Sequence, residues 1–318
     1  MKILYYLLRS ARPRQWLKNL AVYTPLIFSG FFFYNPTEAP PYFAQVSFAF
    51  VIFCTLASSI YLINDIIDVE ADRSHPYKKQ RPIASGKLPI PVATFVAVAG
   101  LLTVFLLSLS LSNFFKLLLL SYLILQVLYS TTFKHIPIID VISIATGFLI
   151  RVYAGAALVN LHTNSWFLLT VVSASLFLAV GKRQSERTLL RDQKLGKTRK
   201  SLTKYSQRLL DVYTGMFANA TWLTYAIYAF QYTNFHPEPA HERFVGFYSI
   251  LPRTFQSQKL LMLTIPFVIF GVMRYLQLVY EENRGESPER VLLNDRPMLI
   301  DALLYIILTM MVIYLPSN

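Results

Sequence analysis

Four polar side chains gather where a long apolar segment opens into a basic loop, in the stretch YLINDIIDVEADRSHPYKKQRPIASGKLP at residues 61–89. On a helix that turns by about 100° per residue, all four fall within an arc of roughly 100°. They are Asn64, Asp65, Asp68 and Asp72. Glu70 lies roughly 240° from Asn64 and points elsewhere. The sequence therefore predicts an acidic face that is patterned rather than generally charged.

Carboxylates packed this closely repel one another unless a cation lies among them. Oxygen ligands without a neighbouring His or Cys favour Mg²⁺ over zinc or copper. Such a site usually takes its remaining oxygens from water and a substrate phosphate or pyrophosphate. The same polyanion would suit the cations that follow in the loop. These are Lys78, Lys79, Arg81 and Lys87. The alternative is a solvated cytoplasmic loop, whose cations the positive-inside rule predicts without any substrate.

The elements that must position these residues are helices of membrane length. Of the 318 residues, 54% are hydrophobic, and they include 24 Phe and 20 Tyr. The single Cys54 provides neither a disulfide framework nor a thiolate metal cluster. Windows of about 20 apolar residues predict an all-α polytopic membrane protein, one domain over residues 1–318, with nine spans. The predicted spans are 17–34, 42–66, 89–111, 113–131, 138–159, 165–182, 212–231, 258–278 and 297–315.

The distribution of basic residues predicts the orientation. With a cytoplasmic N-terminus and an external C-terminus, 25 of the 30 Lys and Arg residues fall on inner segments. The net charge of +13 therefore follows topology, and with no nucleic-acid module visible it argues against a nucleic-acid partner. The basic inner face is instead suited to anionic lipids and polyanionic substrates. We expect an integral protein of the cell membrane whose acidic face opens to the cytoplasm.

A second long inner loop follows the sixth predicted span and reads GKRQSERTLLRDQKLGKTRKSLTKYSQR from Gly181. Lys182, Arg183 and Glu186 fall within about 100° of helical arc and form a mixed basic and acidic face. The alternative is a cytoplasmic helix with ordinary charge pairs.

Arg151 lies deep in a predicted span, in the segment FLIRVYAGAA. A buried Arg usually faces the interior of a bundle and meets an anionic partner, which here is either a substrate phosphate or Asp140. The Gly and Ala residues around it indicate close helix packing. We assign no catalytic or binding role to the predicted outer loop at residues 232–257.

The pattern NDxxDxxxD, present here as NDIIDVEAD, resembles the first aspartate-rich motif of the UbiA superfamily of intramembrane prenyltransferases. Most aromatic prenyltransferases of that superfamily carry a DxxxD motif in the later loop, where this chain has KRQSER. The departure points to one branch, the decaprenyl-phosphate phosphoribosyltransferases, which four segments resemble. These are RPRQWLKN at 12–19, HPYKKQRPIASGKLP at 75–89, GFLIRVYAGA at 147–156 and GKRQSE at 181–186.

That resemblance implies transfer of phosphoribose from 5-phosphoribosyl 1-diphosphate (PRPP) to a polyprenyl phosphate, as a step toward arabinose donors for cell-wall polymers. Asp65, Asp68 and Asp72 would act in catalysis and, with Asn64, hold Mg²⁺ and the diphosphate. The basic residues and Glu186 would complete the pocket for the phosphates. These are Lys78, Arg81, Lys182 and Arg183.

Arg14 and Lys18, beside Trp16, are candidates for the phosphate of the lipid or simply anchor the first span. The prenyl length and the oligomeric state, a homo-oligomer included, stay open.

Two other functions compete with this one. A prenyltransferase that moves a prenyl chain from its diphosphate to an aromatic acceptor would use the same first motif and Mg²⁺. This chain lacks the DxxxD motif of such enzymes, and it carries more cations than an aromatic acceptor would need. A transporter with a cation site would place ionisable residues near the middle of the membrane. The predicted carboxylates gather at the inner boundary instead.

Overall fold

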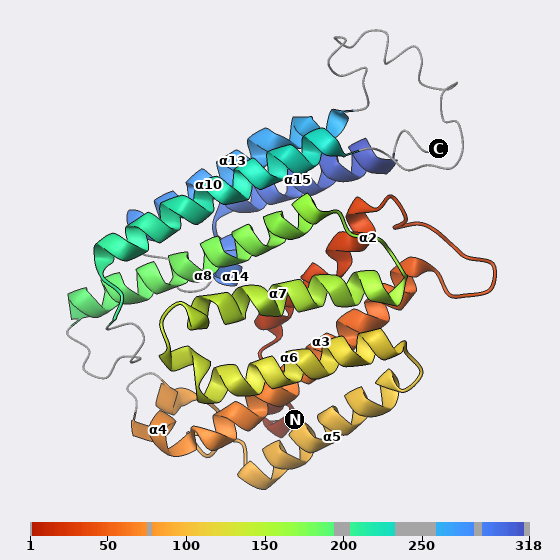
Figure 1. Cartoon of the computed structure of the whole chain (residues 1–318). Helices are drawn as coiled ribbons and strands as arrows, with labels where there is room; N and C mark the ends of the chain where they lie inside the picture. The colour runs from red at the N-terminus through yellow and green to blue at the C-terminus, as the bar shows by residue number, and fades with distance from the viewer. Residues whose placement is uncertain (1, 75–77, 194–203, 233–258, 283–287, 315–318) are drawn as a thin grey trace. The chain divides into compact units, whose positions relative to one another are not determined.

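We describe residues 2–74, 78–193, 204–232, 259–282 and 288–314 of a computed structural model of the chain. Every regular element in these ranges is a helix, as the sequence predicts (Figure 1). The predicted outer loop at residues 232–257 lies, except for Tyr232, outside the described residues. The chain packs as two compact units, which are treated separately below. The first comprises Met1–Thr24, Asn35–Thr131 and Ile150–Asn160, and the second comprises Pro25–Tyr34, Thr132–Leu149 and Leu161–Asn318.

The first unit is built around α3 (Tyr42–Ile67), which α1 (Lys2–Ala11), the 3-10 helix η1 (Pro13–Tyr23) and α5 (Ile90–Ser108) all contact. Figure 1 shows α5 and α6 (Asn113–Thr131) beside α3. One cluster of buried apolar side chains joins α3, α5 and the loop between them. It consists of Leu62, Ile83, Leu88, Ala93 and Ala97, with Tyr6 and Leu7 of α1 packed against it.

The residue spacing predicts the acidic motif on one continuous helix, but the structure divides it between two helices. Helix α3 ends at Ile67, and the short α4 (Val69–Ser74) begins after a break at Asp68, where φ is −85° and ψ is 6°. Backbone bonds still bridge this break, because the Asp68 N–H donates to the Asn64 carbonyl at 3.0 Å and the Asp72 N–H donates to the Asp68 carbonyl at 2.8 Å. The break therefore interrupts the helix at one residue without separating the motif.

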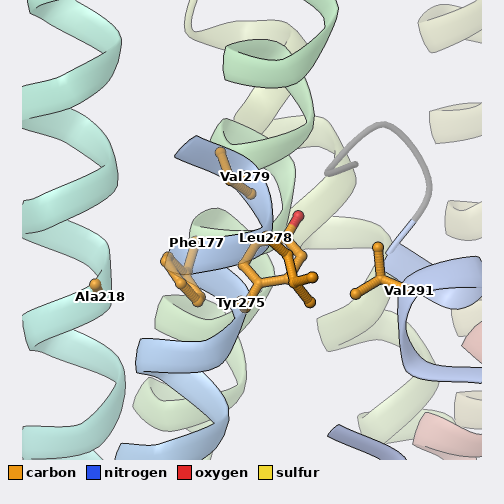
Figure 2. Close-up of a cluster of buried hydrophobic side chains, with 6 residues drawn as sticks. All are labelled: Phe177, Ala218, Tyr275, Leu278, Val279 and Val291. Carbon is orange, nitrogen blue, oxygen red and sulfur yellow. The ribbon is translucent and has the colours of Figure 1, made fainter. Parts of the chain in front are cut away.

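The second unit contains α8 (Ser165–Gln193), α10 (Gln207–Gln231), η4 (Leu260–Thr264), α13 (Ile265–Tyr280), α14 (Pro288–Asn294) and α15 (Arg296–Tyr314). Helix α13 packs on α8, α10 and α15. Figure 2 shows the core cluster at this junction, where the Tyr275 ring meets Phe177 edge to face at 5.2 Å. A Cβ atom at Gly181 would lie 2.7 Å from the Tyr275 ring, so this glycine lets α8 approach α13 just before Lys182.

Helix α7 (Ile139–Leu158) gives its residues up to Leu149 to the second unit and the rest to the first. Its small residues allow the close packing that the sequence indicates, since a Cβ atom at Gly155 would overlap the carbonyl oxygen of Val22.

Gly155→Ala is therefore expected to lower the free energy of unfolding by about 1–3 kcal/mol, because a backbone oxygen cannot rotate away from the added methyl group. Thermal unfolding in detergent measures this. Gly215→Ala in α10 is the matched control, because no atom lies within 4 Å of the added Cβ there. Equal effects of the two substitutions would contradict the close approach at Gly155.

Seven helices in the described residues are long and apolar enough to cross a membrane, and they match seven of the nine predicted spans. They are Tyr42–Ile67, Ile90–Ser108, Asn113–Thr131, Ile139–Leu158, Ser165–Thr188, Leu260–Tyr280 and Arg296–Tyr314. The predicted span 17–34 corresponds to η1 followed by the five-residue α2 (Thr24–Phe28). The predicted span 212–231 corresponds to α10, whose buried face carries three Thr hydroxyls bonded to their own helix.

Candidate active site

Two carboxylates of the acidic motif meet at one guanidinium in the first unit. Nη1 of Arg81 lies 3.0 Å from Oδ1 of Asp65 and 2.6 Å from Oδ2 of Asp72. Nη2 of Arg12 also contacts Oδ1 of Asp65, at 2.5 Å, and Nζ of Lys78 lies 4.0 Å from Oδ1 of Asp72. Both carboxylates are almost fully buried, with 3% and 2% of Asp65 and Asp72 exposed. Buried carboxylates require such partners, because an unpaired charge away from water is costly.

Arg12 reaches this cluster because the chain turns sharply between α1 and η1. Its backbone is left-handed, with φ 54° and ψ 60°, which is uncommon for a residue other than glycine. The corner is tied to α3, since Nε1 of Trp16 donates to Ser58 at 3.0 Å and the Ser58 hydroxyl donates to the Ala11 carbonyl at 3.2 Å. The guanidinium of Arg12 also lies over the Tyr61 ring, 5.0 Å from its centroid.

Arg81 is held by a compact loop between α4 and α5. The Ser85 N–H donates to the Arg81 carbonyl at 2.9 Å, and the Leu88 N–H donates to the Pro82 carbonyl at 2.9 Å. Gly86 has φ 74°, a value that glycine adopts without strain. Arg73 fastens the loop to α4 through a bond from its Nε to the Ala84 carbonyl at 3.3 Å. Within residues 78–88 of the predicted basic loop, these bonds direct Arg81 to the carboxylates.

A pocket of about 200 Å³ opens beside this cluster. Three arginines and one carboxylate contribute to its wall, so the lining is suited to a phosphorylated ligand. The lining residues are Arg9, Ser10, Arg12, Asp65, Gln80, Arg81 and Pro82. Arg9 and Arg12 were not among the residues predicted from the sequence, although Arg12 opens the RPRQWLKN segment that was singled out.

The donor set fits the predicted Mg²⁺ by its chemistry, because oxygen atoms of Asp65 and Asp72 already converge on one cationic nitrogen. Asn64 and Asp68, the other predicted ligands, are half-buried at the end of α3. Within the described residues, no three His, Cys, Asp or Glu side chains are arranged as a metal site. Guanidinium groups neutralise the carboxylates in this arrangement, and a divalent cation would compete with them for the same oxygens.

The second predicted cluster comes together in the second unit, on α8. Arg183 is fully buried, and its Nη1 lies 2.5 Å from Oε2 of Glu186, while Nζ of Lys182 lies 3.9 Å from Oε1 of Glu186. Nε of Arg183 donates to Oδ2 of Asp140 at 2.9 Å, and this carboxylate is also fully buried. The pairs of Glu186 with Lys182 and Arg183 are the charge pairs along one helix that the alternative interpretation expects, whereas the buried pair of Arg183 with Asp140 joins two helices. Asp140 enters the cluster from the first turn of α7.

Arg151 does not pair with Asp140, contrary to one of its two predicted partners. The two residues lie on the same helix, about 16 Å apart along its axis, and Arg151 instead bonds two neutral groups. Its Nε donates to Oδ1 of Asn19 at 2.7 Å, and its Nη2 donates to the hydroxyl of Tyr122 at 2.6 Å. Arg151 thereby anchors η1 and α6 to α7 inside the first unit.

Arg14 and Lys18 lie on η1 and do not line the pocket beside Asp65. Arg14 is exposed, and Nζ of Lys18 donates to Oε1 of Gln15 at 2.6 Å. Arg12 precedes η1 in a left-handed conformation and reaches Asp65, whereas Arg14 lies within η1 and is exposed. The residue spacing in the segment 12–19 could not show which of the two arginines lines the pocket.

The described residues form only helices, and seven of these helices are long and apolar enough to cross a membrane, as in an integral membrane protein. Residues 23–292 match the UbiA prenyltransferase family, and the chain belongs to that family. It is an enzyme, a transferase with close similarity to proteins of the pentosyltransferase kind.

A decaprenyl-phosphate phosphoribosyltransferase of Corynebacterium glutamicum is 34% identical over 97% of this chain and 87% of its own length. A protein of the same name from Mycolicibacterium smegmatis is 41% identical over 70% of each chain. The structure of a UbiA homolog from Archaeoglobus fulgidus bound to GPP and Mg²⁺ is similar in fold, with a TM-score of 0.65 and 18% identity over 97% of this chain and 99% of that one.

Proposed function

We propose that the enzyme transfers 5-phosphoribose from PRPP to a polyprenyl phosphate, with release of diphosphate, in a Mg²⁺-dependent reaction. The observation that carries this proposal is the pocket beside Asp65, in whose lining three arginines outnumber the single carboxylate. PRPP brings a diphosphate and a 5-phosphate, and the lipid brings another phosphate. The names of the relatives support transfer of a phosphoribosyl group to a prenyl phosphate.

The chemistry of the donor set assigns Asp65, Asp68, Asp72 and Asn64 to a bound Mg²⁺, which when present would neutralise the leaving diphosphate. Arg12, Arg81 and Lys78 would bind phosphate oxygens of PRPP. An oxygen of the lipid phosphate forms a bond to ribose C1 while the bond from C1 to the diphosphate breaks. The carboxylates favour the positive charge that develops on C1, as in other glycosyl transfers.

No general base is required, because the lipid phosphate is already ionised at neutral pH. We also assign Lys182 and Arg183 to the phosphates of the donor. Glu186 would hold these two cations in place through its ion pairs with them. Arg14 and Lys18 would meet the phosphate of the lipid, and Arg151 would hold η1 in place. The chain would then be one transferase domain with nine spans and an active site that faces the cytoplasm.

Transfer of labelled phosphoribose from PRPP to decaprenyl phosphate by the purified protein tests this function. We expect a phosphoribosyl lipid that forms with Mg²⁺ and disappears with EDTA or in Asp68→Ala. Prenylation of an aromatic acceptor from a polyprenyl diphosphate, with no product from PRPP, would instead identify the competing prenyltransferase.

Arg12→Ala is expected to raise the KM for PRPP by about 10- to 100-fold, which corresponds to the loss of one charge-assisted hydrogen bond. Arg14→Ala, two residues away, is the matched comparison and should change the KM for the lipid phosphate while leaving that for PRPP unaltered. Steady-state kinetics with each substrate varied in turn separates the two effects. A larger effect of Arg14→Ala on PRPP would contradict the assignment of Arg12 to the donor.

A further inference from the structure

The orientation of Arg183 is set by a carboxylate from outside its own helix. Asp140 and Arg183 are both fully buried, and Nε of Arg183 donates to Oδ2 of Asp140 at 2.9 Å. This bond and the contact of Nη1 with Glu186 use two different edges of the guanidinium. Two such contacts on a planar group fix its plane as well as its position.

The other oxygen of the Asp140 carboxylate has a partner of its own. The hydroxyl of Tyr205 donates to Oδ1 at 2.8 Å and accepts a bond from the backbone N–H of Ile138 at 2.5 Å. Tyr205 is 1% exposed and packs against Val141 and Leu210, so its ring cannot move freely. Burial raises the pKa of the Tyr205 phenol, and the hydroxyl therefore keeps its proton and continues to donate at physiological pH.

The backbone in front of Asp140 is strained. Ile138 has φ 70°, a left-handed conformation that is a genuine outlier for a β-branched residue. Such strain costs about 1–3 kcal/mol, persists only where the surroundings impose it, and clusters at functional sites. The bond to Tyr205 is one of the constraints here, and the turn brings Asp140 into the first turn of α7, where the helix dipole favours a carboxylate.

We propose that Asp140 and Tyr205 are positioning residues for Arg183, which they hold in the orientation that binds a phosphate group of the donor. This inference rests on the proposed function of Arg183. Neither residue need touch substrate, because Tyr205 bonds Asp140 and Asp140 bonds Arg183. The strained turn at Ile138 places its N–H on the Tyr205 hydroxyl, which in turn bonds Asp140. Packing of the ring alone would not need this hydroxyl.

Tyr205→Phe tests the proposal because it removes only the hydroxyl and keeps the ring in its cluster. We expect the KM for PRPP to rise about tenfold, since small displacements of a binding group weaken its contacts strongly, with the KM for the lipid phosphate unchanged. Tyr213→Phe is the matched control, because Tyr213 packs against the same cluster. In an Arg183→Lys background, Tyr205→Phe should add no further change to the KM for PRPP.

Two outcomes would overturn the proposal. One is a donor KM in Tyr205→Phe equal to that in Tyr213→Phe, with only the thermal stability reduced. The other is an effect of Tyr205→Phe that persists in full in the Arg183→Lys background. If that background does not fold, the comparison of the two Tyr→Phe variants, together with Asp140→Asn, still decides.

Binding of inorganic diphosphate in the presence of Mg²⁺, measured as a shift in the thermal unfolding temperature, separates this inference from the proposed function. A protein that fails to use PRPP but loses diphosphate affinity in Tyr205→Phe, and not in Tyr213→Phe, would reject the function and keep the positioning role. A protein that uses PRPP equally well in both variants would keep the function and reject the positioning role.

Discussion

Asp72→Asn is expected to lower the rate of phosphoribosyl transfer by about 100- to 1000-fold, the range seen when one group that stabilises transition-state charge is removed. Asp72 is 2% exposed and contacts Nη1 of Arg81 at 2.6 Å, so the amide takes a charge from the centre of the acidic cluster. The shape of the side chain hardly changes, and Arg81 keeps Asp65 as a partner. The loss should therefore fall on the reaction and much less on the fold.

Initial rates at saturating PRPP and Mg²⁺ measure this effect. Glu70→Gln is the matched control, because Glu70 lies on the same short helix, is exposed, and loses the same formal charge. An Asp72→Asn enzyme within threefold of the control would show that Asp72 is a structural partner of Arg81 and no part of the reaction centre.

Asp140→Ala is expected to lower the free energy of unfolding by about 3–5 kcal/mol, because it leaves the buried Arg183 guanidinium without its Nε partner. The hydroxyl of Tyr205 loses its acceptor at the same time. These losses differ from those at an exposed ion pair, which is worth about 0–1 kcal/mol.

Unfolding of the detergent-solubilised protein by heat or denaturant measures the cost. Glu186→Gln removes the other carboxylate that contacts Arg183, but that side chain is 24% exposed and its loss should cost about 1 kcal/mol or less. If the two substitutions lowered the free energy of unfolding equally little, water or another group would have to reach the Arg183 guanidinium in Asp140→Ala and compensate its charge.

The sequence was sufficient for the membrane-length helices, the acidic motif and the mixed charges on α8, because each depends on a local period or spacing. It was insufficient where a backbone turn decides a direction. The helix of the motif breaks at Asp68, and the left-handed residue Arg12 lines the pocket whereas Arg14 does not. No spacing rule reports a turn of that kind.

Long-range pairing was the other limit. Asp140 was considered only as a partner of Arg151, its neighbour along one predicted span, whereas its partner Arg183 lies 43 positions away. Tyr205 was one aromatic residue in a basic loop and carried no local signal. The strained turn at Ile138 has none either, since a β-branched residue rarely adopts a positive φ.

The single Arg81 nitrogen shared by Asp65 and Asp72 has a thermodynamic consequence. Because guanidinium groups already compensate the two carboxylates, we expect the fold to persist without a metal ion, unlike small domains that unfold when their metal is removed. Under the proposed function, a metal ion would have to displace Arg81 and Arg12 from these oxygens, and a polyanion that attracts both guanidiniums would favour that exchange. Metal and polyanion would then be linked ligands, and each would raise the affinity of the enzyme for the other by the same factor.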